Sequence, residues 1–115
     1  MSEYRVIVCG GRDYTDQDAI RSVLSRWKER RADVVIVHGD ARGTDRLADH
    51  VARMMGFVVE RYPADWSGFG RAAGPIRNQI MVDSGADLVV AFPGGAGTRD
   101  LVRRAVKRGI PVERA

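Results

Sequence analysis

Four short runs rich in apolar and β-branched residues divide the chain, and a helical pattern follows each of them. The runs are residues 5–9, 33–38, 57–62 and 87–92. Runs that lack polar alternation are typical of parallel strands buried on both faces. Because these strands alternate with helices, they predict an α/β fold, in which a parallel sheet of four to five strands lies between two helical layers as a three-layer sandwich.

The segments between the runs show the spacing of amphipathic helices, with apolar residues at every third or fourth position. These segments are residues 16–31, 44–55, 74–84 and 98–108. Thr44 and Thr98 are expected at the N-caps of the second and fourth helices, and Pro75 at the first position of the third. Residues 63–73 predict an irregular loop, longer than an ordinary connection, and residues 110–112 predict a short fifth strand.

The expected topology locates a site at one end of the sheet. Right-handed crossovers favour the strand order 3-2-1-4-5, in which the sequence reverses direction between the first and fourth strands. Ligands of such sheets bind beyond the carboxyl ends of the strands, near that reversal. Those ends carry residues 10–12, 38–40 and 92–97, so we expect the site there.

The composition fits one folded domain over residues 1–115 and excludes several other classes. Of the 115 residues, 44% are hydrophobic and 30% are charged, which excludes a disordered chain. The single cysteine, Cys9, excludes an internal disulfide, and no Cys/His spacing suits zinc, so we expect neither a metal nor a cofactor. No apolar run reaches the ~18 residues of a membrane span, and the first residues lack a signal-peptide pattern. We expect a cytoplasmic protein with no membrane partner.

The strongest chemical motif is the glycine-rich segment between the fourth strand and the last helix. It contains Pro93, Gly94, Gly95, Gly97 and Thr98. Glycines let the backbone approach a ligand, and the free amides and dipole of a helix start favour an anion, so a phosphate is the expected occupant. A tight strand-to-helix turn is the alternative. The motif differs from a Walker loop, since no lysine follows the glycines, and from the dinucleotide fingerprint, which would follow the first strand.

A second loop has the same order of features, with glycines, a threonine and an acid at a helix start. Its candidate ligand-binding residues are Gly39, Asp40, Gly43, Thr44 and Asp45. Both threonines can act as helix caps, and both Asp45 and Asp100 can either complement a helix dipole or contact ribose hydroxyls. His38, at the end of its strand, is interpreted as a hydrogen-bonded anchor in preference to a base.

Basic and aromatic side chains complete the candidate site. The chain has a net charge of +4, and 17 of its 19 basic residues are arginine, which suits bidentate contacts with phosphate. Arg77 and Asn78 lie in the first turn of the third helix, where Arg77 could clamp a phosphate or simply be solvated. Arg12 follows Gly10 and Gly11 closely enough to reach the same anion. Two aromatic residues of the long loop could stack on a base or cover the sheet edge, and these are Trp66 and Phe69.

Four motifs in this order resemble the SLOG superfamily, in its branch related to YspA. They are residues 10–13, 38–45, 74–81 and 93–98. The resemblance implies a Rossmann-like fold that binds nucleotides or nucleotide-derived ligands. Within the superfamily, LOG enzymes are phosphoribohydrolases that cleave the base from cytokinin nucleoside monophosphates, and relatives of DNA-processing protein A bind single-stranded DNA. Other members sense nucleotide-derived signals, often beside phage-conflict or mobile-element genes, and small members resemble dimers.

The LOG motif reads PGGxGTxxE, and this chain departs from it at the glutamate. Arg77 matches the LOG arginine, but Leu101 stands at the glutamate position and Asp100 is the nearest acid. The first hypothesis is therefore nucleotide binding or sensing. The alternatives are hydrolysis of nucleoside monophosphates, with Arg77 and Asp100 as catalytic residues, and single-stranded nucleic-acid binding through the basic residues 103–108. We also expect a homodimer, with Trp27 or the apolar side of the third helix as the contact.

Overall fold

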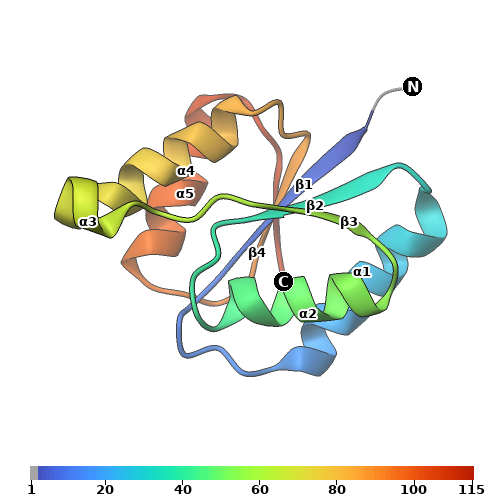
Figure 1. Ribbon diagram of the computed structural model, residues 1–115. Helices are drawn as coiled ribbons and strands as arrows, with labels where there is room; N and C mark the ends of the chain where they lie inside the picture. The colour runs from blue at the N-terminus through green and yellow to red at the C-terminus, as the bar shows by residue number, and fades with distance from the viewer. Residues whose placement is uncertain (1–2) are drawn as a thin grey trace.

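The computed structural model describes residues 3–115, in which one sheet is packed between helices (Figure 1). The elements in chain order are β1 (Tyr4–Cys9), α1 (Gln17–Arg30), β2 (Val34–His38), α2 (Thr44–Met54), β3 (Val58–Arg61), α3 (Trp66–Phe69), the 3-10 turn η1 (Gly70–Ala72), α4 (Ala73–Asp83), β4 (Leu88–Ala91), α5 (Ala96–Lys107) and β5 (Val112–Arg114). None of the helices in this described part is long and apolar enough to cross a membrane.

The sheet has five parallel strands in the order β3-β2-β1-β4-β5, which confirms the expected fold class and strand order. The central strand β1 pairs with β2 on one side and with β4 on the other. Val6, for example, lies opposite Ile36 of β2 and Leu88 of β4. The sequence therefore reverses direction between β1 and β4, as right-handed crossovers require.

Side chains of β1 alternate between two hydrophobic cores, one on each face of the sheet (Figure 1). Val6 and Val8 pack with α1 and α2, whereas Ile7 packs with α4 and α5. Trp27 belongs to the first core, where its ring stacks on Tyr4 at a centroid distance of 5.3 Å. Only 9% of Trp27 is exposed, so packing inside the core leaves little surface for the dimer contact predicted for it.

The segment predicted as an irregular loop is largely helical. Residues 66–72 form α3 and η1, and α4 begins at Ala73, so that Pro75 is the third helical residue and not the first. The side chain of Asp65 accepts a hydrogen bond of 2.9 Å from the backbone amide of Gly68, which stabilises the first short turn. Such turns are too short to show an apolar period, so the sequence pattern could not reveal them.

Both threonines predicted as N-caps lie inside their helices. Gly43 is the N-cap of α2 and Gly95 that of α5, and within the described chain neither helix start has a side-chain cap. Thr44 is the first residue of α2, and Thr98 the third of α5. The cap predictions are wrong because the glycines allow each helix to begin closer to its strand than a threonine cap would.

The fifth strand covers Val112–Arg114 and not residues 110–112. The amide of Ile110 donates a 2.9 Å hydrogen bond to the carbonyl of Ala105, which completes the end of α5. Pairing with β4 begins only after this helix end, where Val112 lies opposite Val89.

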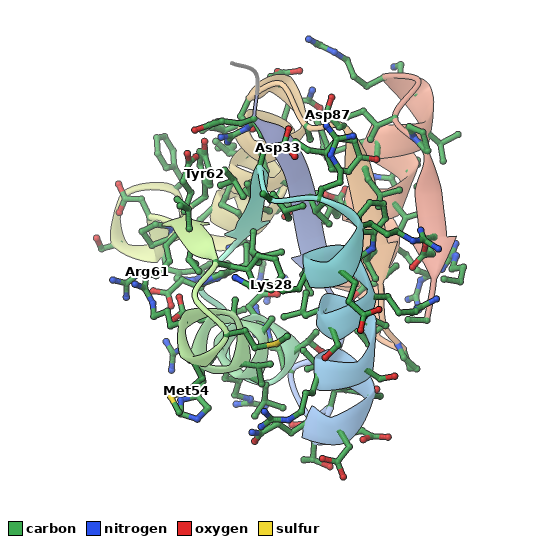
Figure 2. All side chains as sticks on the ribbon, turned by 90° about the vertical axis from the view of Figure 1, so that its right-hand side faces the viewer. Lys28, Asp33, Met54, Arg61, Tyr62 and Asp87 are labelled. Atoms are coloured by element: carbon green, nitrogen blue, oxygen red, sulfur yellow. The ribbon has the colours of Figure 1, made fainter. Side chains whose placement is uncertain are left out.

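The two ends of the sheet differ in character. Asp33, just before β2, and Asp87, just before β4, lie at one end (Figure 2). Asp33 accepts a 2.8 Å hydrogen bond from the guanidinium of Arg31, and Asp87 accepts one of 2.8 Å from the amide of Arg5. Hydrogen bonds within the protein therefore satisfy both carboxylates. The loops after β1, β2 and β4 lie at the opposite, carboxyl end, which carries the cavities described next.

Candidate functional site

A cavity of about 770 Å³, here called the glycine crevice, lies at the carboxyl ends of β1 and β4. It falls at the reversal of strand order, as the topology predicted. Its lining includes eleven of the predicted ligand-binding residues, namely Gly10, Gly11, Arg12, Asp45, Arg77, Asn78, Pro93, Gly94, Gly95, Gly97 and Thr98. The lining also includes residues that were not predicted for the site, among them Cys9, Tyr14 and Met81.

A second cavity of about 500 Å³, here called the arginine cavity, lies next to the first, toward the end of β2. The two cavities share Arg12, Ala41 and Arg77 in their walls. Gly39 and Asp40, both predicted, line only the arginine cavity. Three predicted residues, Gly43, Thr44 and Asp100, line neither cavity.

The first turn of α5 forms one wall of the glycine crevice. Its N-cap Gly95 has no side chain to satisfy the amides of the turn, and Gly95, Ala96 and Gly97 all line the crevice. Amides at a helix start, together with the helix dipole, favour an anion. The wall therefore has the chemistry predicted for a phosphate.

The glycines of this loop separate into two kinds. A Cβ at Gly94 would lie 2.7 Å from the amide nitrogen of Gly11, so close packing between the loops requires a glycine there. A Cβ at Gly95 or Gly97 would meet no atom of the described residues within 4 Å. A tight turn therefore explains Gly94 but not the other two, which leave open space along the crevice wall.

Thr44 ties the β1 loop to the start of α2. Its backbone amide and its hydroxyl each donate a 3.1 Å hydrogen bond to the carbonyl of Gly11. Gly10 packs directly against the Thr44 side chain, and a Cβ at Gly10 would lie 2.9 Å from the Cβ of Thr44. Because Thr44 is completely buried, it holds the two loops together and offers no surface for the ligand contact predicted for it.

Arg77 is anchored between the loops, which makes the interpretation as a solvated surface arginine wrong. Its Nη1 donates to the carbonyl of Gly39 and, at 3.4 Å, to that of Tyr62, and its Nε donates to Asn78 Oδ1 at 3.0 Å. Burial lowers the pKa of Arg77, while the neighbouring carboxylate of Asp45 opposes that shift. Within residues 3–115, Nη2 has no hydrogen-bond partner, so it stays available at the cavity wall.

Asp100 is held by a network beside the crevice. Its carboxylate accepts hydrogen bonds from Asn78 at 3.0 Å, Arg103 at 2.6 Å and Arg104 at 2.9 Å. Partial burial would raise the pKa of Asp100, but the hydrogen bonds from Arg104 and Asn78 outweigh it and lower the pKa. Asp100 thus stays ionised and occupied, whereas Leu101, at the LOG glutamate position, is buried and lines the crevice.

Arginines in and just after the last turn of α5 are also paired within the chain. Arg104 donates to Gln79 at 2.9 Å as well as to Asp100, and Arg108 donates to Asp83 at 2.6 Å. These pairs join α5 to α4. They provide a structural use for the arginines on which the nucleic-acid alternative rests.

Two buried polar side chains hold the loop after β2, and Asp45 is the first. It is 7% exposed, and its carboxylate accepts hydrogen bonds from the amides of Gly39 at 3.1 Å and Ala41 at 3.2 Å. Burial is the largest influence on Asp45 and raises its pKa. Both of these hydrogen bonds use Oδ2, so the ribose contact predicted for Asp45 would fall to its other carboxylate oxygen, Oδ1.

His38 is the second buried polar side chain that holds the loop after β2. It is the hydrogen-bonded anchor that the sequence indicated. It is completely buried, and its Nε2 lies 2.6 Å from Asp49 Oδ2. Its Nδ1 accepts a 2.9 Å hydrogen bond from the amide of Asp40, which identifies Nε2 as the protonated nitrogen. Asp40 has a φ of 56°, an uncommon conformation for a residue other than glycine, and this hydrogen bond helps to hold it.

The Asp49 pair predicts a stability that depends on pH. Burial would raise the pKa of Asp49, but hydrogen bonds from Arg53 and His38 outweigh it and lower the pKa below the usual 3.8. A depressed folded pKa means that the ionised form stabilises the fold above pH 3.8 and that this contribution is lost as the pH falls through the folded value. We expect Asp49→Asn to melt below the wild type at pH 7, with the gap closing below about pH 4. Melting curves from about pH 2.5 to 7 test this, and a constant gap would contradict it.

The thiol of Cys9 lies in the crevice floor without a reactive environment. It is a free, buried cysteine, and burial raises its pKa to about 12. Among residues 3–115, no group of three or more His, Cys, Asp or Glu side chains is arranged to hold a metal ion. The lining of the glycine crevice presents backbone amides, apolar and neutral polar side chains, the arginines Arg12 and Arg77, and the acidic residues Asp13 and Asp45.

A doubly wound parallel sheet with glycine-rich loops around a crevice at its carboxyl edge defines a Rossmann-like α/β protein. The chain belongs to the YspA, cpYpsA-related SLOG family, whose model matches residues 4–69. This match confirms the superfamily and the branch that the four motifs indicated.

The chain is also similar to a phage protein over nearly the whole length of both. The chain is 43% identical over 116 residues to the Gene 61 protein of Mycobacterium phage D29, a match that covers 94% of this chain and 93% of the relative. A phage homologue fits the expected association with phage or mobile-element genes.

Solved structures share the fold. DNA processing protein A (DprA) from Streptococcus pneumoniae superimposes with a TM-score of 0.82 at 18% identity, over 97% of this chain and 50% of that chain. The chain thus spans half the length of that structure. The C-terminal domain of PF1911 hydrogenase from Pyrococcus furiosus matches with a TM-score of 0.57 at 17% identity, over 100% of this chain and 94% of that one. At such identities the likeness concerns the fold alone.

Proposed function

We propose that the glycine crevice binds a phosphorylated nucleotide or nucleotide-derived molecule, and that the protein acts as a sensor of that ligand. The observation that carries the proposal is the uncapped first turn of α5, where Gly95 and Gly97 leave open space in a crevice that Arg12 and Arg77 also line. The amides and dipole of the turn suit a phosphate. The free Nη2 of Arg77 adds a charged donor at the same crevice.

A melting-shift experiment with the full chain tests the proposal. A ligand present at about 100 times its dissociation constant stabilises a fold by about 2.7 kcal/mol. For a domain of this size, that corresponds to a rise in melting temperature of roughly 10 °C. The panel contains nucleoside mono- and diphosphates, cyclic nucleotides, ADP-ribose and NAD. The absence of any shift at millimolar concentrations would contradict nucleotide binding.

We expect binding without turnover of nucleoside monophosphates. Cleavage of an N-glycosidic bond builds positive charge on the ribose, and a carboxylate must stand beside it. Leu101 occupies the LOG glutamate position, and Asp100 is already held by Asn78, Arg103 and Arg104. Chromatography of AMP or cytokinin monophosphates incubated with the protein should show no free base. Base release that is lost in both Asp100→Asn and Arg77→Ala would contradict this expectation and favour the hydrolase.

We also propose that the protein forms a homodimer through α4. Because Trp27 is buried, the dimer contact is assigned to the apolar side of this helix. There Ile76 is 38% exposed and Ile80 52% exposed, and the neighbouring Phe69 is 55% exposed. These three side chains line one small groove together with Tyr62. Light scattering at micromolar concentration should give twice the chain mass of 12.7 kDa. Ile80→Arg should reduce the mass to that of one chain, whereas a monomeric wild type would contradict the proposal.

A further inference from the structure

We infer that the ligand carries two anionic groups with an aromatic ring near the second, the chemistry of a dinucleotide, and that the arginine cavity holds its second half. This inference rests on the proposed function of the glycine crevice and extends it to the class of ligand. The arginine cavity, about 500 Å³ in volume, supplies the space.

The two cavities are neighbours along the carboxyl edge of the sheet. Their walls share Arg12, Ala41 and Arg77. The glycine crevice lies beyond β1 and β4, and the arginine cavity lies beyond β2, the next strand in the sheet. Two strand spacings amount to about 10 Å, so a ligand that fills both cavities must be an extended molecule.

The charge of the arginine cavity favours an anion. Arg12, Arg42, Arg46 and Arg77 line it, and Asp40 is the one acidic residue among its described lining. The guanidinium of Arg42 lies 3.2 Å from Asp13 and that of Arg46 lies 3.8 Å from Asp40, and both arginine side chains are exposed. Exposed pairs of this kind contribute little stability. A phosphate can therefore replace the two aspartates as the partner of these arginines and accept bidentate hydrogen bonds from them.

An aromatic surface lies beside this charge. Trp66, the first residue of α3, lines the arginine cavity and is 48% exposed. The guanidinium of Arg12 lies 5.6 Å from the centre of its ring. A Cβ at Gly74 would lie only 3.2 Å from the ring, so the indole is packed against the start of α4 and held in place. A fixed, half-exposed indole among arginines is a platform on which a nucleotide base can stack.

Calorimetric titration of the full chain separates the two halves of the proposed ligand. The probes are nucleoside 5′-monophosphates and the 5′-phosphorylated dinucleotides in which both bases are the same. Each common base is tested, once with ribose and once with deoxyribose. For a base that binds, the dinucleotide should bind at least about tenfold more tightly than the monophosphate. The double variant Arg42→Ala/Arg46→Ala should lose most of that gain, and its monophosphate affinity should stay within about twofold of the wild type.

The charge-matched control is Arg21→Ala/Arg30→Ala, which removes two exposed cations that line neither cavity. The control should keep the full dinucleotide gain. An equal loss in the control would overturn the inference, because it would indicate long-range attraction. Equal affinities for both probes, or a gain that survives Arg42→Ala/Arg46→Ala, would overturn it as well.

Further outcomes have distinct meanings. If neither monophosphates nor dinucleotides bind to the wild type, the proposed function fails and the inference fails with it. If monophosphates bind and dinucleotides bind no better, only the inference fails. Affinity that continues to rise with length up to a single strand of about ten nucleotides would overturn the two-group ligand and indicate a nucleic-acid interface instead.

Discussion

Gly43→Ala is expected to lower the free energy of unfolding by about 3 kcal/mol, combining backbone strain at a positive φ with steric overlap. Gly43 has a φ of 81°, and a Cβ there would strike the carbonyl oxygens of Gly11 and Arg12. Both obstacles are backbone atoms, which cannot turn away as a side chain can. The loss is large against the roughly 5–15 kcal/mol by which domains are typically stable. Urea unfolding of the variant and the wild type measures it.

Gly109→Ala is the control for a positive φ without steric overlap. Gly109 also has a φ of 81°, but a Cβ there would meet no atom of residues 3–115 within 4 Å. It should therefore cost only the conformational strain, about 1–2 kcal/mol. The difference between the two variants reports the close approach of the β1 loop to the start of α2, together with the extra strain from the ψ of −126° at Gly43. Equal losses would contradict the view that this approach requires a glycine.

Gly97→Ala is expected to reduce nucleotide affinity at least about tenfold without destabilising the free protein. Gly97 is the second residue of α5, and the space where its Cβ would lie is open among the described residues. Alanine in a helix is favoured over glycine by about 1 kcal/mol, so the free protein should melt at the same temperature or higher. The added methyl group would occupy the crevice wall, where we propose that the backbone amides bind the phosphate.

The same calorimetric titration measures this loss, with the tightest-binding ligand of the melting-shift panel as the probe. Ser22→Ala, on the exposed side of α1, is the control, because it also improves helix propensity but lies away from both cavities. Its affinity should equal that of the wild type. An unchanged affinity in Gly97→Ala would place the phosphate elsewhere than at the start of α5.

The strands, their order and the position of the cavity were all predictable from local pattern. Strands buried on both faces need uninterrupted apolar runs, and residues 34–38 show this directly, since all five are buried. Chirality of the crossovers then limits the strand order. The position of the cavity follows from that order, since the loops after β1 and β4 must meet where the sequence reverses direction.

Helix starts and short turns were predicted less well. Thr98 has the residue type of an N-cap, yet α5 begins two residues earlier, at Ala96. Residues 66–72 form helical turns whose stability comes from the Asp65 cap and from packing of Trp66 near Gly74. Local propensity is weak at such positions, so contacts with distant segments decide the outcome.

The sequence by itself determined the α/β class, the parallel sheet, the family and a phosphate-compatible loop at residues 93–98. It could not assign a role to each glycine, because an added Cβ at Gly94 would meet Gly11 of a distant loop, whereas one at Gly97 would meet no described atom within 4 Å. Nor could it show that Arg77 bonds to the Gly39 carbonyl, or that Arg42 and Arg46 line one cavity. Only the tertiary structure decided these points, because they depend on distances between loops that separate strands bring together.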